Sequence, residues 1–439
     1  MHFIFLSLLS IAQAFFFGIR SEPKLCKISN REVHTVIPHN SPLISKISGF
    51  YGLIGPDINK SDINTLYGLF TGDGVIQGAF FDKETITFVR HFVRTEKLVF
   101  ESIHGKFSDH MMMTPLYMAM HKLGILPNIM GLANTAFLKI EDQIFALFER
   151  DSPYKISIDF EKNHVSTVTK KHIPGVRHFS GHSKYDAAAK MVHTIDYDVL
   201  RNNVAYVRIH NNSFQKAIIP TKYIPIVHDF ALLNATHMIF VDSPFVWNFR
   251  KKIPVAMDAS KPTYIQLYDT TTNVCTRITC PESFYVFHYG SIEEGSIYAP
   301  LYDTLDFGSL ELAGKYREIR LLTSSQVVIK KNPALEQLNL DFPMKWQQYV
   351  VLREVENRTI TGFVVCKQLN IVRKLRLPEN RLFCGEPAII EVEGSPFLIG
   401  FAYDKEDNGY ILLLGIFTDE YVEIPLGQSV SIGFHSIFT

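Results

Sequence analysis

The chain has 439 residues, of which 46% are hydrophobic and 20% charged, so it can bury a large core and is not of the disordered class. Lys plus Arg and Asp plus Glu both number 44, which gives a formal net charge of zero. Because no basic run with interleaved aromatic residues is present, we expect no nucleic-acid partner. Five cysteines are too few for a disulfide scaffold, although Cys275 and Cys280 could bridge across a turn in an oxidising compartment.

The N-terminus resembles a secretory leader. An apolar run is followed by Ala12-Gln13-Ala14, a small-residue cleavage pattern, so we predict a signal peptide over residues 1–14, with its end between residue 14 and about residue 20. No Lys or Arg precedes Arg20, and an apolar anchor or a buried first strand are the alternatives. Sequons at Asn59, Asn211, Asn234 and Asn357 are compatible with the secretory pathway or secretion.

Residues 22–439 read as one β-rich domain. Short strand-like runs such as GVIQGAFF (74–81) and PFLIGFAYD (396–404) alternate with turn signals such as Gly72-Asp-Gly, and helical periods are scarce. Many short strands over this length predict a closed or radial all-β architecture, either a propeller or a large barrel. No exact repeat gives a blade count.

One segment departs from this pattern. Residues 110–132, HMMMTPLYMAMHKLGILPNIMGL, carry six methionines and hardly any charge. They predict either a buried helix, since methionine fills irregular core space, or an exposed apolar lip that contacts a membrane or lines a tunnel entrance.

Four histidines are candidate metal ligands. They lie in separate segments, namely His182 in FSGHSKYD, His228 in PIVHDFAL, His288 in YVFHYGSIEEG and His435 in IGFHSIFT. The chain has 17 histidines, so any one of these alone could be an ordinary core or surface residue. Only a closed fold whose elements point at one axis would unite all four. Four neutral imidazoles suit a divalent transition metal, with iron as the redox-active candidate.

Further motifs occur around these histidines in a fixed order. They are Gly49-Phe-Tyr-Gly-Leu-Ile-Gly-Pro56, Leu69-Phe-Thr-Gly-Asp-Gly74, Phe92-Val-Arg-Thr95, Ala133-Asn-Thr135 and Phe148-Glu149. Together with the histidine segments, they resemble the carotenoid cleavage oxygenase family from about residue 48 to the last few residues. This resemblance implies a seven-bladed β-propeller with a helical or loop cap over an axial Fe(II) site held by the four histidines.

The resemblance also implies carboxylates that fix the second imidazole nitrogens. It pairs Glu149 with His228, Asp341 with His288 and Glu386 with His435. Asp341 departs from the family, which has Glu there, and its shorter side chain puts the tuning of the metal in doubt. Thr135 matches a threonine whose methyl group points at the vacant iron position in the family; the alternative is an ordinary strand threonine.

The implied reaction adds dioxygen across a conjugated double bond of a carotenoid or apocarotenoid and yields two carbonyl products. The partners would be an apolar polyene and O2, with peripheral membrane contact through residues 110–132. Stilbene-cleaving relatives carry a lysine before the first supporting glutamate, and Phe148 here disfavours a hydroxystilbene. Two alternatives stay open: a retinyl-ester isomerohydrolase on the same site, and a non-enzymatic propeller that binds a polyene or a partner.

Other catalytic classes lack their signatures. The sequence has no Gly-x-Ser-x-Gly elbow, phosphate loop or dinucleotide fingerprint. The dipeptide His228-Asp229 resembles a phosphohydrolase dyad, but it is only two residues long and lies in a strand-like segment.

Overall fold

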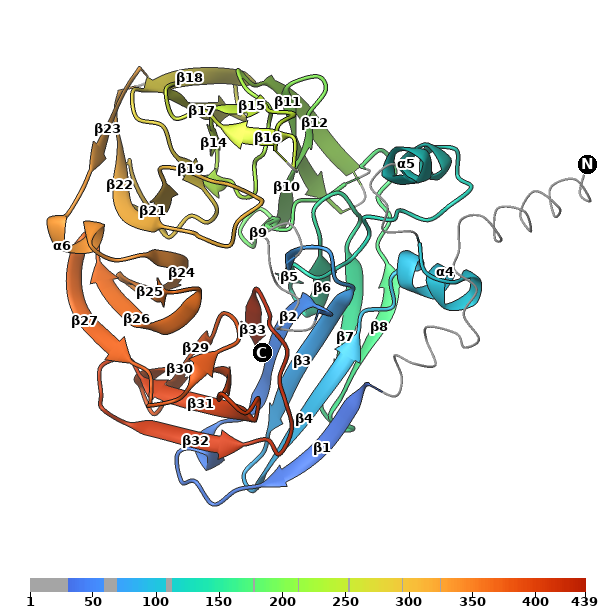
Figure 1. Ribbon diagram of the computed structural model, residues 1–439, viewed down its shortest axis with the longest axis vertical. Helices are drawn as coiled ribbons and strands as arrows, with labels where there is room; N and C mark the ends of the chain where they lie inside the picture. Colours follow the sequence, from blue (N-terminus) through green and yellow to red (C-terminus); the bar gives the residue numbers. More distant parts are fainter. Residues whose placement is uncertain are drawn as a thin grey trace, which may run out of the picture.

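The computed structural model describes residues 31–58, 69–107 and 113–439, apart from residues 177, 212, 252, 294 and 324. Its strands form a ring of sheets around a central axis, and the C-terminus lies near that axis (Figure 1). Seven sheets of four or five antiparallel strands and one two-stranded hairpin are found in this part of the chain. The predicted seven-bladed β-propeller is therefore confirmed.

The first three sheets, or blades, are built from the two ends and the first half of the chain. The first blade comprises β1 (Val33–Pro38), β4 (Thr85–Phe92), β3 (Gly74–Phe81), β2 (Gly49–Pro56) and β33 (Ser436–Phe438). The second comprises β5 (Ala136–Ile140), β6 (Gln143–Leu147), β7 (Tyr154–Asp159) and β8 (His164–Lys170). The third comprises β9 (Lys184–Asp186), β10 (Met191–Asp198), β11 (Asn203–His210) and β12 (Ser213–Pro220).

The remaining blades follow in chain order. The fourth comprises β13 (Ala231–Leu232), β14 (His237–Asp242), β17 (Thr263–Asp269) and β18 (Val274–Cys280), and the hairpin β15 (Phe245–Trp247) and β16 (Val255–Met257) branches from it. The fifth comprises β19 (Tyr285–Val286), β20 (Ser291–Glu293), β21 (Ser296–Tyr302), β22 (Gly314–Thr323) and β23 (Gln326–Lys330). The sixth comprises β24 (Leu340–Trp346), β25 (Tyr349–Glu356), β26 (Thr359–Lys367) and β27 (Asn370–Arg376). The seventh comprises β28 (Leu382–Phe383), β29 (Ala388–Val392), β30 (Ser395–Tyr403), β31 (Gly409–Gly415) and β32 (Tyr421–Pro425).

The burial of each strand depends on its place in the blade. Every residue of β3, a middle strand, is buried, because both of its faces pack against neighbouring blades. The outer strand β27 alternates between exposed and more buried residues, as expected for a sheet with one solvated face. The core is accordingly a ring of interfaces, and one hydrophobic cluster joins the first blade to the seventh through Leu53, Phe88, Phe401 and Leu413.

The two ends of the chain close the ring in the first blade. Strand β33 pairs antiparallel with β2, with Leu53 opposite Ser436. The Ile54 amide donates to the His435 carbonyl at 3.0 Å, so the residue before β33 is fixed by the first blade. Buried Gln77 in β3 adds a second link, since its side chain both accepts from the Ser431 amide and donates to the Ser431 carbonyl, at 2.7 and 2.8 Å.

Helices are few in the described residues. They are the 3-10 turn η1 (Ile44–Lys46) and the α-helices α4 (Glu96–His104), α5 (Thr114–Lys122) and α6 (Pro333–Glu336). Helices α4 and α5 lie at the edge of the ring beside the second blade, away from the axis in this view (Figure 1). None of the described helices has the length and hydropathy needed to cross a bilayer.

The methionine-rich segment combines both predicted characters. Residues 108–112 lie outside the described part, while Tyr117 of α5 is buried against Phe107. Large apolar side chains on the same segment are exposed: Leu116 (42%), Met118 (43%), Leu123 (74%) and Ile125 (42%). The helix is therefore anchored by one face and presents the other to its surroundings.

Two further predictions concern the cysteines and the leader. Cys275 and Cys280 lie in one strand, β18, so a bridge between them is wrong. Five residues of extended chain span roughly 16 Å, far beyond the reach of a disulfide. The predicted signal peptide over residues 1–14 lies outside the described residues.

Candidate metal centre and substrate cavity

The four candidate histidines all lie next to the innermost strands of blades. His182, His228 and His435 precede β9, β13 and β33, and His288 lies between β19 and β20. These strands line the axis of the ring (Figure 1). The first, third, fourth and fifth blades thus each contribute one imidazole, which explains why the sequence separates them so widely.

The imidazoles meet at the axis. Ring nitrogens of His182, His228 and His288 lie within 4.8 Å of one another, and the Nε2 atoms of His182 and His228 are 2.9 Å apart. The His435 ring completes the group, with its centroid 4.7 Å from that of His182 and 4.9 Å from that of His288. The structure therefore unites all four histidines in one cluster.

Glu149 holds the outer nitrogen of His228. It follows β6 in the second blade, and its carboxylate accepts from His228 Nδ1 at 2.5 Å and from the Tyr197 hydroxyl at 2.9 Å. Burial alone would raise the pKa of Glu149, but His228, Tyr197 and Arg150 outweigh it and hold this pKa below its usual value. The carboxylate stays ionised and directs His228 Nε2 toward the axis.

Glu386 performs the same task in the seventh blade. It lies between β28 and β29, and its carboxylate is 3.3 Å from His435 Nδ1 and accepts from the Ser436 amide at 2.9 Å. The Tyr51 hydroxyl donates to the Glu386 carbonyl at 2.9 Å, which fixes the backbone beneath this contact. Glu386 therefore orients the imidazole that the closing strand delivers.

The Asp341 carboxylate binds Arg353 and not the His288 imidazole. Both of its carboxylate oxygens accept from Arg353, at 2.8 and 2.9 Å, and no hydrogen bond joins it to His288 in the described residues. In the described residues, Asp341 is therefore paired with Arg353 and not with His288. The physical reason is a competing partner: Arg353 lies on β25, directly opposite Asp341 in the register of the sixth blade, and its planar guanidinium binds a carboxylate with two parallel bonds.

An aromatic ring packs beside His288. Phe342 lies 4.5 Å from the His288 ring and 4.8 Å from the His435 ring, measured between centroids. On its other side, the Arg353 guanidinium carbon is 3.5 Å from the Phe342 centroid. The Phe342 ring, which also contacts the buried Arg353 guanidinium, therefore packs against His288 and His435.

The cluster fits a divalent metal ion. Burial and the neighbouring histidines hold the pKa values of His182 and His288 well below the usual range, so both rings are neutral and keep a lone pair. His288 Nε2 is buried without a hydrogen-bond partner among the described residues. Imidazole nitrogens about 2.1 Å from a metal at right angles to each other are about 3.0 Å apart, close to the His182–His228 separation.

A cavity of about 560 Å³ opens onto this cluster. His228, His288 and His435 lie on its wall, and most of the other lining side chains are apolar or aromatic. The aromatic lining residues are Phe70, Phe148, Tyr197, Tyr285, Phe287, Tyr302, Phe307, Phe342, Phe383, Tyr403 and Phe434. A space of this size and character suits an elongated apolar ligand.

Thr135 and Phe148 both face this cavity. Thr135 precedes β5 and is nearly buried, and its hydroxyl donates to the Asn134 side chain at 3.2 Å. A β-carbon added to Gly181, the neighbour of His182, would lie 2.8 Å from the Thr135 methyl group. The Thr135 methyl thus packs against the backbone that carries one of the four imidazoles.

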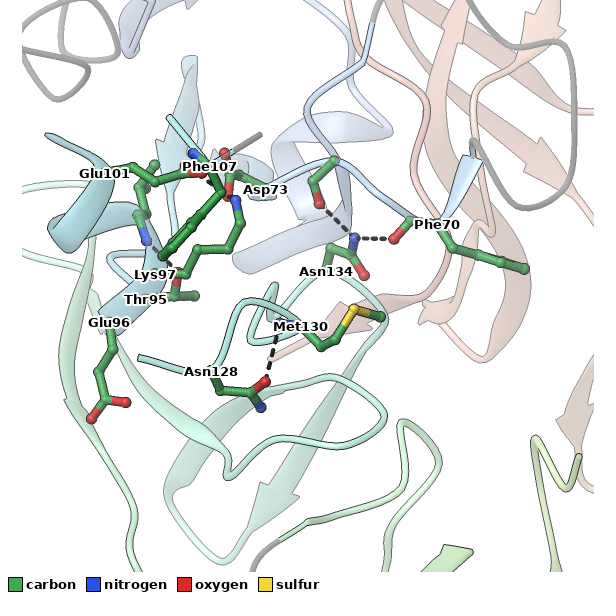
Figure 2. Close-up of polar contacts among 12 residues, drawn as sticks. Phe70, Asp73, Thr95, Glu96, Lys97, Glu101, Phe107, Asn128, Met130 and Asn134 are labelled. Atoms are coloured by element: carbon green, nitrogen blue, oxygen red, sulfur yellow. Dashed lines mark hydrogen bonds and ion pairs between the residues drawn. The ribbon is translucent and has the colours of Figure 1, made fainter. Parts of the chain in front are cut away.

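Asparagine side chains hold the loop residues Phe70 and Met130 on the cavity wall (Figure 2). The Asn134 amide donates to the carbonyls of Phe70 and Gly72, at 3.2 and 2.7 Å. Asn128 accepts from the Met130 amide at 3.1 Å.

Helix α4 is tied to the same region. The Thr95 hydroxyl caps its first turn by accepting from the Leu98 amide at 3.1 Å. Lys97 then binds Asp73 and Glu101, at 2.9 and 3.1 Å (Figure 2). Because Asp73 precedes β3, this ion pair joins the helix to the first blade.

Sequence reasoning missed several residues of the site. Tyr197, which supports Glu149, and Arg353, which takes Asp341, lie in strands whose local sequences carry no signal for either role. Asp229, part of the dyad considered with His228, accepts from Lys184 Nζ at 2.8 Å. Only the pairing of strands across the blades could have revealed these contacts.

Comparison with known proteins places this geometry in a family. The model of the RPE65 family, described as retinal pigment epithelial membrane protein, matches residues 45–439, nearly the whole chain. The chain belongs to this family, that of the carotenoid cleavage oxygenases. The likeness expected from the sequence motifs is thereby confirmed.

Individual relatives are more distant. The carotenoid 9,10(9',10')-cleavage dioxygenase 1 of Arabidopsis thaliana is 29% identical over 235 residues, which cover 49% of this chain and 42% of the relative. The aligned part thus spans less than half of that relative's length. The cobalt-substituted apocarotenoid oxygenase (ACO) of Synechocystis shares the fold at a TM-score of 0.73 with 15% identity, over 93% of this chain and 96% of its own. A lignostilbene dioxygenase of Pseudomonas brassicacearum does so at 0.73 with 14% identity, over 93% and 95%.

Proposed function

We propose that this oxygenase-family chain is an Fe(II) dioxygenase that cleaves a conjugated double bond of a carotenoid or apocarotenoid. The main support for this proposal is that an apolar cavity opens onto four clustered imidazoles. His182, His228, His288 and His435 would hold the iron, and the iron would supply the reactivity toward dioxygen when bound. The names of the relatives support the substrate class.

The chain's own residues account for the remaining requirements. The Glu149 and Glu386 carboxylates contact Nδ1 of His228 and His435, which leaves Nε2 of each ring free to face the metal and fixes the ring planes. The aromatic wall excludes water and holds a rod-shaped polyene so that one double bond lies beside the imidazoles. Thr135 narrows the space next to His182 and would admit a molecule as small as O2.

Phe148 narrows the substrate class further. Its ring lies on the cavity wall directly before Glu149. A phenyl group can neither accept a proton nor stabilise a phenolate, so a hydroxystilbene would find no partner there. A hydrocarbon polyene or an apocarotenal has no phenol and needs no such partner.

The activity is tested with purified protein loaded with ferrous iron and incubated with an apocarotenal in detergent. We expect two shorter carbonyl products that form in air and not under argon, and whose formation His182→Ala abolishes. His193→Gln is the matched control, because His193 is a buried histidine of the same blade outside the cluster. Conversion of a retinyl ester under argon would favour the isomerohydrolase, and no turnover of either substrate would favour a binding protein.

The exposed side of α4 and α5 supports a membrane contact. Ile103 on α4 (71% exposed), Leu116 on α5 and Leu123 just after α5 are large apolar side chains at the molecular surface. Such a surface would let a lipid-dissolved polyene pass from the bilayer to the cavity. We therefore expect peripheral binding to membranes through this segment.

Flotation with phosphatidylcholine liposomes tests this contact. Replacing both Leu116 and Leu123 by Lys should shift most of the protein from the floating to the soluble fraction. Ile218→Lys, at a 55% exposed apolar position on the outer strand β12, should leave flotation unchanged. Equal flotation of all three proteins would exclude this surface as the membrane contact.

A further inference from the structure

Asp229 makes several hydrogen bonds that have no role in the proposed reaction. Its side chain is 5% exposed, and it follows His228 directly. Oδ1 accepts from Lys184 Nζ at 2.8 Å and from the Phe230 amide at 2.7 Å. Oδ2 accepts from the Tyr289 amide at 3.2 Å. Both oxygens of a buried carboxylate are thus occupied by donors.

The two donors that come from other blades each lie close in sequence to one of the four histidines. Lys184 follows His182 by two residues in the third blade, and Tyr289 follows His288 directly in the fifth blade. Asp229 itself belongs to the fourth blade, between them. A single carboxylate therefore links the histidine-bearing segments of three consecutive blades.

Neighbouring contacts reinforce this linkage. The Lys184 ammonium lies 5.2 Å from the centroid of the Phe230 ring, so its position is set by the arene as well as by Asp229. The Ser180 hydroxyl accepts from the His182 amide at 3.0 Å and lies 3.4 Å from the His228 carbonyl. His435 takes no part, since Glu386 and β2 fix it instead.

We infer that Asp229 is a positioning residue that sets the relative placement of His182, His228 and His288. Blades of a propeller meet through apolar side chains, and such contacts can slide by small amounts. A charged carboxylate that accepts from three donors instead fixes the segments that carry those donors near the axis. Metal affinity depends on ligand atoms being held at the right separation before the ion arrives. This inference rests on the metal site of the proposed function.

Asp229→Asn tests the inference with little change in shape. An amide offers only one acceptor oxygen. If its NH2 group stands in place of Oδ2, the link to the Tyr289 amide is lost; if it stands in place of Oδ1, the links to Lys184 and to the Phe230 amide are both lost. We expect the affinity for Co(II), measured by chelator competition and by the visible absorption of the bound ion, to fall about 10- to 100-fold, the usual range for groups that support ligands. Lys184→Met, which removes only the link to the His182 segment, should give a smaller fall in the same direction.

Asp242→Asn is the matched control. Asp242 is a buried carboxylate of the same blade that accepts from the amides of Lys222 and Tyr223 and from the Gln266 side chain, at 2.7, 3.3 and 3.1 Å. Its loss should lower the melting temperature of the metal-free protein and leave the Co(II) affinity at the wild-type value.

The outcomes separate the inference from the proposed function. Weaker Co(II) binding by Asp229→Asn beside unchanged binding by Asp242→Asn supports the positioning role. Wild-type affinity in Asp229→Asn, or equal losses in both variants, would overturn the inference and leave the metal site standing. Failure of the wild-type protein to bind Co(II) at all would remove the proposed function and this inference with it.

Discussion

At the scale of single residues, the ion pair between Asp341 and Arg353 decides how His288 is held. The carboxylate of Asp341 stops at Arg353, and Phe342 fills the space beside the imidazole. The backbone of Phe342 has a φ of 42°, in the left-handed region that non-glycine residues rarely adopt. The bulge of β24 at this point turns the ring toward His288 and His435. His288 thus relies on packing, whereas His228 and His435 rely on carboxylates.

Asp341→Asn should therefore mainly lower stability, whereas Glu149→Gln should mainly lower metal affinity. Asp341 and Arg353 are each about nine-tenths buried, and removing one partner of a buried ion pair destabilises a protein by about 3–5 kcal/mol. We expect Asp341→Asn to lower the free energy of unfolding by that order, with metal affinity changed less. Glu149→Gln should lower metal affinity about 10- to 100-fold with a smaller effect on stability. Urea unfolding and metal titration of both variants check this, and a reversed pattern would contradict the assignment.

At the scale of elements, the pairing of β10 with β11 buries a histidine outside the metal cluster. His193 Nδ1 contacts the Tyr206 hydroxyl at 2.5 Å, and its Nε2 has no partner among the described residues. Burial, aided by Arg208 and opposed by Asp186, lowers the pKa of His193 to about 4. The folded protein therefore resists protonation of this residue at a pH where the unfolded chain, with a histidine pKa of about 6.5, accepts it.

Stability should fall as the pH drops from 6.5 toward 4. In this window the unfolded state binds more protons than the folded state, so the free energy of unfolding rises with pH, by up to about 1.4 kcal/mol per pH unit for one such histidine. The lowered pKa values of His182 and His288 act in the same direction in the metal-free protein. His193→Gln should reduce the slope of unfolding free energy against pH in this window. An unchanged slope would mean that His193 titrates normally in the folded protein.

At the scale of the whole molecule, the ring depends on close backbone contact where it closes. A β-carbon added to Gly55 in β2 would lie 2.5 Å from both the Gly433 α-carbon and the Ile432 carbonyl oxygen. Only glycine allows β2 to approach the segment that leads to His435. The same contact therefore serves both the closure of the propeller and the placement of one imidazole.

Gly55→Ala should separate β2 from this segment. We expect a loss of about 1–3 kcal/mol in unfolding free energy, the usual cost of overpacking, and weaker metal binding because His435 moves. Gly308→Ala is the control, since its added β-carbon would meet only the Asp306 side chain, at 3.2 Å. Equal unfolding midpoints in urea for the two variants would show that the closing contact tolerates a methyl group.

Much of this architecture could be predicted from the sequence, for identifiable reasons. Strands such as Gly74–Phe81 and Ser395–Tyr403 have strand composition between turn signals, so their positions were predictable. Strand β19 covers only Tyr285–Val286, because the chain leaves the sheet before His288 to present the imidazole. The blade count and the histidine cluster required the family resemblance, since the blades are not exact repeats. The partnership of Asp341 with Arg353 depends on register, which no local pattern encodes.

The central claim is that four histidines from four blades form one iron site. Metal analysis of purified protein, with iron, zinc and copper quantified, tests it most directly on the wild type, His288→Ala and His193→Gln. We expect about one iron per chain in the wild type and in His193→Gln, and strong loss of iron in His288→Ala. Absence of metal from the wild type even after anaerobic ferrous loading, or equal iron in all three proteins, would contradict it.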